Sequence, residues 1–372
     1  MNKTGIYIHI PFCKQKCRYC DFVSYPHLLG EGERYVHALI QEMKRYEGVA
    51  ADSVYIGGGT PTALAPELLE QVLLAVRRSF SLSADCEVTV EANPGTCDLS
   101  GFSRLAAAGV NRVSLGVQSM VDAELSALGR IHTAEDAQKA AEAVRCAGIE
   151  NLSLDFMFSI PLQTRKSMVE SLQKAVDIGP EHLSCYSLIL AEGTPMFCAA
   201  ERGELSLPDD EEDRERYAIL TEFLEKHGYG RYEISNFAKE GYSARHNTKY
   251  WTREPYIGLG AAAHSFYQNC RYENPVDLEA YFSQIENSTV PEKTEIAGED
   301  AMAEFMVLGL RLTKRGICRS DFENQFGISF NERYGKVAQK LGSLGMLTDD
   351  GERICLTDRG IDVSNAVFCE FL

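Results

Sequence analysis

Short runs of aliphatic and β-branched residues alternate with longer amphipathic segments along the first half of the chain. The short runs predict strands over residues 6–10, 54–56, 87–90, 113–117, 152–156 and 183–189. The segments between them, rich in Ala, Leu and Glu, predict helices over residues 33–46, 66–80, 99–108, 134–147 and 166–178. This alternation predicts six βα units around a parallel sheet. The spacing is compatible both with an open sheet and with an incomplete (β/α) barrel.

The pattern changes after about residue 195 to helices and aromatic-rich loops. Residues 299–372 show three helical patterns, at 300–311, 319–326 and 332–342, followed by short strands at 346–348 and 353–356. This arrangement resembles a winged helix. DNA binding would be its usual function, but the segment holds 12 acids against 9 Lys and Arg, which argues against it. We expect this domain to cover the barrel mouth or to dock a partner.

Composition narrows the class of protein. The chain has 372 residues and a formal net charge of −17, which argues against general nucleic-acid binding. No apolar run reaches the roughly 18–20 residues needed to span a membrane. Twelve cysteines without a signal peptide predict a reducing compartment, the cytoplasm. Peripheral contact with a membrane and a homodimer are both compatible with this composition.

The candidate metal site is the segment Cys13-Lys-Gln-Lys-Cys17-Arg-Tyr-Cys20. Cysteine thiolates hold iron–sulfur clusters, usually one per iron. A four-iron cluster on three cysteines leaves one iron without a protein ligand, and that iron can bind a small molecule. A structural zinc site usually needs four ligands in paired units, whereas the other nine cysteines are scattered singly. We therefore assign Cys13, Cys17 and Cys20 as cluster ligands.

Polar residues and glycines follow the predicted strands. Gly57-Gly58-Gly59-Thr60 ends the second strand, Glu91 the third and Gln118 the fourth, and the fifth carries Asp155. Ligands of parallel α/β folds bind at the carboxyl ends of the strands. Each feature has a plainer alternative: a tight turn, a helix cap or a satisfied core amide. Their position at the same end of successive strands favours a binding site.

With these motifs, the chain resembles the radical S-adenosylmethionine (SAM) superfamily from Tyr7 to about Ile189. The resemblance implies an incomplete (β/α)6 barrel with a smaller C-terminal, mostly helical, winged-helix-like domain. It implies a [4Fe–4S] cluster whose free iron is chelated by SAM, and an electron that splits SAM into a 5′-deoxyadenosyl radical. The SAM-binding residues it implies are Tyr7, Tyr19, Gly58, Gly59, Thr60, Glu91, Gln118, Arg130 and Asp155.

A closer resemblance is to the coproporphyrinogen III dehydrogenase-like group, through Tyr-Ile-His-Ile-Pro-Phe-Cys13 and Gly-Gly-Gly-Thr-Pro-Thr62. Phe22 stands where the dehydrogenase pattern has a fourth cysteine, and only a dozen residues precede Cys13. Both departures match a sister group of heme chaperones. That resemblance implies heme binding and transfer to heme-requiring acceptor proteins, membrane-bound ones included. The alternative is a radical SAM enzyme acting on coproporphyrinogen III.

The sister group also carries a His-Asn-x-x-Tyr-Trp motif, present here from His246 to Trp251. Neutral imidazole is a common axial ligand of heme iron, and Tyr250 and Trp251 could stack on a porphyrin. The plainer alternative is that His246 only packs and hydrogen-bonds. We divide the chain into a radical SAM core (1–230), a connecting region with this motif (231–298) and the C-terminal domain (299–372).

Overall fold

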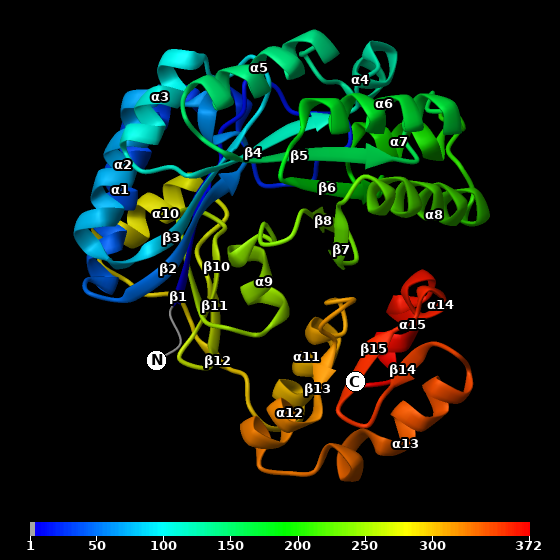
Figure 1. Ribbon diagram of the computed structural model, residues 1–372. Coiled ribbons are helices and arrows are strands. Elements are labelled where there is room, and N and C mark those ends of the chain that lie inside the picture. Colours follow the sequence, from blue (N-terminus) through cyan, green and yellow to red (C-terminus); the bar gives the residue numbers. More distant parts are fainter. Residues whose placement is uncertain (1–3) are drawn as a thin grey trace.

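The computed structural model describes residues 4–372 and contains a twelve-stranded mixed sheet (Figure 1). Six parallel strands form its centre: β1 (Thr4–Ile10), β2 (Ala50–Gly58), β3 (Ser81–Ala92), β4 (Arg112–Gln118), β5 (Asn151–Phe158) and β6 (His182–Ser187). Between them come α1 (Gly32–Met43), α2 (Pro66–Ser79), α3 (Leu99–Ala107), α4 (Asp122–Leu128), α5 (Ala134–Cys146) and α6 (Arg165–Ile178). The predicted incomplete (β/α)6 barrel is confirmed. Strands β2 and β3 begin earlier than predicted, and β6 ends two residues sooner.

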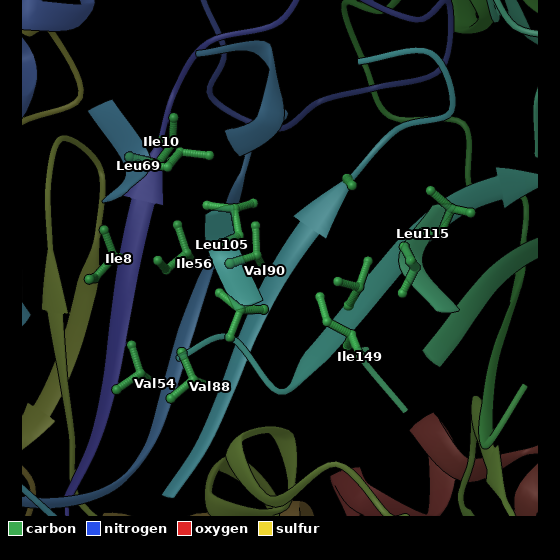
Figure 2. Close-up of a cluster of buried hydrophobic side chains, with 14 of the residues drawn as sticks. Ile8, Ile10, Val54, Ile56, Leu69, Val88, Val90, Leu105, Leu115 and Ile149 are labelled. Atoms are coloured by element: carbon green, nitrogen blue, oxygen red, sulfur yellow. The ribbon is translucent and has the colours of Figure 1, made fainter. Parts of the chain in front are cut away.

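Alternate residues of each central strand have different surroundings. Ile8, Val54, Ile56, Val88 and Val90 are buried between the sheet and the outer helices (Figure 2). The intervening positions carry polar residues, several of which line a cavity inside the barrel. This two-residue period follows from the strand geometry, in which successive side chains point to opposite faces. It lets one sheet hold an apolar core on one side and a polar site on the other.

Short strands extend the sheet at both edges. On one side β9 (Tyr256–Leu259) runs parallel to β1, followed by β10 (His264–Tyr267), β11 (Cys270–Glu273) and β12 (Thr294–Glu295). On the other side, β8 (Asn236–Ala238) pairs with β6, and β7 (Gly230–Glu233) pairs with β8. The segment 231–298 thus completes the sheet, and the domain boundary expected at 230 falls inside β7. Strands of two to four residues are too short to show a period in sequence.

The remaining elements are short or lie outside the sheet. The helices are α7 (Pro195–Glu201), α8 (Asp210–Lys226), α9 (Arg245–Trp251) and α10 (Leu278–Glu286), with 3-10 turns η1 (Pro26–Glu31), η2 (Lys44–Tyr46) and η3 (Pro61–Ala63).

The C-terminal domain has its own apolar core. It contains α11 (Gly298–Gly309), α12 (Arg319–Phe326), α13 (Phe330–Ser343), α14 (Asp358–Asp362) and α15 (Ser364–Cys369). A small antiparallel sheet has the order β13 (Ile317–Cys318), β15 (Arg353–Leu356), β14 (Leu347–Asp349). The three predicted helices and two wing strands are present, and β13, α14 and α15 are additional.

The expectation that this domain covers the barrel mouth is wrong. Its contacts with the barrel involve Arg311 over the Trp251 ring at 4.4 Å and Glu304 with Arg253 at 3.2 Å. Gly5, at the start of β1, donates from its amide to the Pro255 carbonyl just before β9. The domain therefore lies near the amino ends of β1 and β9, away from the cysteine loop that follows β1 (Figure 1).

A buried carboxylate joins α1 to the edge of the sheet. Glu42 accepts hydrogen bonds from the Gly260 amide (2.8 Å), the Asn274 amide group (2.7 Å) and the Tyr281 hydroxyl (2.8 Å). Burial raises the pKa of Glu42, while these three donors act to lower it. The carboxylate thus fixes the turn after β9 and helix α10 against α1.

We expect Glu42→Ala to lower the free energy of unfolding by about 3 kcal/mol, because three buried donors lose their acceptor. Urea denaturation measures the change. Glu33→Ala, on the exposed side of the same helix, is the matched control. Equal stability of the two variants would contradict the role assigned to Glu42.

Candidate functional site

A cavity of about 460 Å³ opens into the barrel beside the cysteine loop. It brings together nearly all the residues that the sequence singled out. Those lining it are Cys13, Cys17, Tyr19, Cys20, Gly58, Gly59, Thr60, Glu91, Gln118, Arg130 and Asp155. Tyr7 and His246 are the exceptions. Tyr7 lines an adjoining cavity of about 470 Å³ together with His9, Tyr250, Tyr256 and His264. His246 is on the lining of neither of these two cavities.

A chain of hydrogen bonds links two of the cysteines across three segments. The Cys13 Sγ lies 3.5 Å from the Thr60 hydroxyl, which accepts from the Asn93 amide group at 2.8 Å. Arg130 donates to the Asn93 amide oxygen at 2.6 Å and to Cys17 Sγ at 3.4 Å. This chain, from Cys13 through Thr60, Asn93 and Arg130 to Cys17, fixes the cysteine loop on the ends of β2 and β3.

The glycine run is required by close approach of its neighbours. Gly58 has a φ of 111°, and a Cβ there would lie 2.5 Å from the His9 ring. A Cβ on Gly59 would lie 2.7 Å from the Phe12 carbonyl oxygen. The Thr60 amide donates to that same carbonyl at 2.7 Å. Glycine here lets the loop that carries Cys13 lie directly against the end of β2.

Two carboxylates stand on the cavity wall. Glu91 accepts from the Tyr55 hydroxyl at 2.7 Å and from the Gly58 amide at 3.1 Å. Burial, with the nearby Asp155 charge, raises the pKa of Glu91 to about 7. Asp155 accepts from the Ser114 hydroxyl at 3.0 Å, and burial raises its pKa as well. Both carboxyls can accept hydrogen bonds from ribose hydroxyls.

Gln118 is held in an unusual backbone conformation at the end of β4. Its φ is 67°, and the pairing of β4 with β5 shifts register between Gly116 and Gln118. Non-glycine residues in this region are strained, and such strain is concentrated at functional sites. The bulge leaves Gln118 on the cavity lining beside Arg130.

The cysteine loop fits an iron–sulfur cluster chemically. Burial raises the pKa of the Cys20 thiol to about 11 and that of Cys13 as well, and the neighbouring Cys17 adds to both effects. Positive charge from bound iron would deprotonate these thiols. Within residues 4–372, no three His, Cys, Asp or Glu side chains converge on a single-ion site. Such a cluster supplies an electron for cleavage of SAM when both are bound.

His246 has both ring nitrogens occupied. Its Nδ1 lies 3.0 Å from the Ser53 hydroxyl and its Nε2 lies 2.9 Å from the Tyr250 hydroxyl. The ring is fully buried and stacks on Tyr55 with centroids 5.4 Å apart. Burial lowers the pKa of His246 to about 3. Heme iron could reach the imidazole only after one of these bonds breaks, so the heme-ligand assignment stays a prediction.

The sequence reasoning missed several residues that line the cavity. These are Asn93, Arg112, Ser114, Ser184, Tyr186 and Asn247. Ser114 shares the two-residue period of Gly116 and Gln118 on β4. Asn93 follows Glu91 at the same strand end. Arg112 and Ser114 on β4, and Ser184 and Tyr186 on β6, could have been identified from the alternation of polar and apolar residues within each strand.

Comparisons with known proteins agree with this architecture. Residues 7–175 match the model of the radical SAM superfamily, and residues 296–363 match the HemN C-terminal domain. The heme chaperone HemW of Lactococcus lactis is 35% identical, over 99% of this chain and 97% of its own. HemW of Bacillus subtilis is 37% identical, over 98% of each chain.

One solved structure has the same fold throughout. Coproporphyrinogen III oxidase (HemN) from Escherichia coli superposes with a TM-score of 0.86 at 22% identity, covering 100% of this chain and 90% of its own.

We expect Cys17→Ala to abolish the brown absorbance of the anaerobically reconstituted protein, because one iron loses its thiolate. Cys146→Ala, an exposed cysteine away from the cavity, is the control and should retain full absorbance. Iron analysis and visible spectra measure both. Four irons per chain in the Cys17 variant would refute the ligand assignment.

Glu91 should make the SAM-free protein less stable as pH rises. Its folded pKa of about 7 exceeds the usual 4.5, so the folded chain binds the extra proton between these values. The free energy of unfolding should therefore fall between pH 4.5 and 7, by roughly 3 kcal/mol in all. Urea titrations of wild type and Glu91→Gln isolate this contribution. Parallel pH curves for the two proteins would show that Glu91 has an ordinary pKa.

Proposed function

Because the chain belongs to the heme chaperone HemW family of the radical SAM superfamily, we propose that it binds heme and transfers it to heme-requiring proteins. The observation that carries this proposal is the match to HemW chaperones over nearly the whole chain. Membrane-bound heme proteins are among the acceptors we propose. No helix within residues 4–372 is long and apolar enough to cross a membrane.

In this proposal the cluster and the SAM site support heme transfer instead of oxidising a porphyrinogen. Cys13, Cys17 and Cys20 would hold the cluster, with Arg130 and Thr60 bonded to two of the thiolates. The two carboxyls of the wall and the glycine run would hold SAM. We place the protein in the cytoplasm, with peripheral contact where an acceptor is membrane-bound, and a homodimer as an assembly to be tested.

The second candidate is a radical SAM dehydrogenase acting on coproporphyrinogen III. The likeness of the fold to HemN favours it, but fold alone does not determine the reaction. Phe22 argues against it, because the dehydrogenase pattern has a cysteine at that position. Its side chain is 67% exposed and lines both cavities.

Anaerobic titration with heme and turnover of coproporphyrinogen III distinguish the two candidates. We expect the reconstituted protein to bind heme at micromolar concentrations and to leave coproporphyrinogen III unchanged in the presence of SAM and reductant. Absorption spectra follow heme, and product chromatography follows the porphyrinogen. SAM-dependent decarboxylation would establish the enzyme, and absence of heme binding would refute the chaperone.

The histidine of the His-Asn-x-x-Tyr-Trp motif gives a second test. We expect His246→Ala to weaken heme binding while leaving the cluster absorbance intact. His37→Ala, on the exposed side of α1, is the matched control. An unchanged heme spectrum together with reduced stability would instead assign His246 to packing, since its two hydrogen bonds and its stacking on Tyr55 would be lost.

A further inference from the structure

A buried arginine faces the cavity without a bonded partner. Arg112 is the first residue of β4, and its side chain is among the largest in the protein that are almost fully buried, with an exposed fraction of 2%. It lines the barrel cavity, and its Nε makes no hydrogen bond. Across residues 4–372, no side chain or backbone carbonyl bonds to its guanidinium, and no carboxylate lies within 4 Å of it. Buried arginines are rarely left in this condition.

The nearby carboxylates are bonded to other groups. Glu91 is held by the Tyr55 hydroxyl and the Gly58 amide, and Asp155 by the Ser114 hydroxyl. The Arg112 charge acts on both at longer range and helps to lower the pKa of each. It therefore contributes to charge balance in the barrel, yet no residue of the described part of the chain accepts a hydrogen bond from its side chain, and its Nε is buried without a partner.

The two buried histidines near Arg112 cannot accept from it. His182 is bonded to the Ser153 hydroxyl at 2.8 Å and to the Tyr232 hydroxyl at 2.9 Å. His246 is bonded on both nitrogens as described above. Burial lowers the pKa of both imidazoles, and the Arg112 charge contributes to that lowering. The surroundings are thus neutral imidazoles and hydroxyls, with an unbonded cation among them.

The cavity lining offers further donors. Asn247, Ser184 and Tyr186 line it together with Arg112. A planar guanidinium with two parallel N–H groups matches a carboxylate, which it binds through two hydrogen bonds. A ligand carboxylate here would satisfy the donors of Arg112, and a charge-assisted bond to a buried side chain is strong.

We propose that Arg112 binds a carboxylate of a ligand held inside the barrel. Two ligands of the proposed function carry one: heme, through its propionates, and SAM, through its methionyl group. Arg112 pairs in register with Thr89, one inward position before Glu91 on β3, so it lies deeper in the barrel than Glu91. This depth favours a propionate, because the likeness to the radical SAM superfamily implies that the SAM carboxylate would go to the cluster iron. The propionate assignment rests on the proposed function, whereas the carboxylate site does not.

The test compares each ligand with an analogue that lacks the carboxylate. Heme is paired with its dimethyl ester, and SAM is paired with 5′-methylthioadenosine. Dissociation constants are measured by anaerobic titration of the reconstituted full chain. The variants are Arg112→Gln, Arg112→Lys and Arg78→Gln, the last being the same charge change on the exposed surface of α2. Cluster absorbance and thermal denaturation report whether each variant folds.

We expect wild type to bind heme at least about tenfold tighter than the dimethyl ester, a difference of about 1.4 kcal/mol. Arg112→Gln should remove that preference by weakening the binding of heme while leaving the binding of the dimethyl ester unchanged. Arg112→Lys should retain part of the preference for heme over its dimethyl ester. The lysine keeps the positive charge but lacks the two parallel N–H groups of the guanidinium. Arg78→Gln should behave as wild type. If Arg112→Gln fails to hold the cluster, the proposal is still tested by two measurements: the preference of wild type for heme over its dimethyl ester, and the size of that preference in Arg112→Lys.

The other outcomes show whether the carboxylate belongs to heme or to SAM. Weaker binding of SAM, with unchanged binding of methylthioadenosine, in Arg112→Gln would support the site and assign it to SAM. Equal effects on each ligand and its analogue, or no effect on any of them, would overturn the proposal. Absence of heme binding by wild type would refute the chaperone function, while the SAM pair would still test Arg112.

Discussion

In β1 to β6, every second side chain points into the barrel, and all six strands run in the same direction. These two constraints of a parallel sheet determine which residues can meet. Glu91, Ser114, Gln118 and Asp155 come from three strands and share one cavity because they occupy inward positions. The outward positions carry the aliphatic residues that hold the helices in place. The apolar core and the polar site therefore depend on the same strand register, and a slip of one residue would exchange them.

Burial shifts the titratable carboxyls and imidazoles of the barrel interior toward their neutral forms. Burial raises the pKa of Glu91 and Asp155 and lowers that of His182 and His246, so each group is shifted toward its neutral form. Hydroxyl groups satisfy most of these side chains. Arg112 brings a guanidinium with five N–H donors into this environment. A ligand that brings negative charge to it would be held more strongly here than at the surface.

Much of the fold could be predicted from sequence because long elements show their period clearly. Helices such as α2 and α12 end within a residue of the prediction, whereas β7 to β12 were not recognised because each has only two to four residues. The cysteine loop and the strand-end residues were predicted from their motifs and lie around one cavity. Arg112 and Asn93 were missed because their importance depends on the direction of the side chain. The docking of the C-terminal domain near the amino ends of the strands rests on contacts such as Arg311 with Trp251, which no local pattern encodes.

The His246 motif is connected to the cluster cavity through a series of side-chain contacts. Glu91 on the cluster cavity is bonded to Tyr55, Tyr55 stacks on His246, and His246 is bonded to Tyr250. Tyr250 lines the adjoining cavity, where it packs edge-on against Tyr256 with ring centroids 4.6 Å apart. A continuous series of contacts thus runs from one cavity to the other, and Glu91 and Phe22 line both. A ligand that moves Glu91 in the first cavity would displace the hydrogen bond of Tyr55, and with it the ring against which His246 is packed. The motif therefore lies beside the wall that the two cavities share, and its contacts connect that wall to α9.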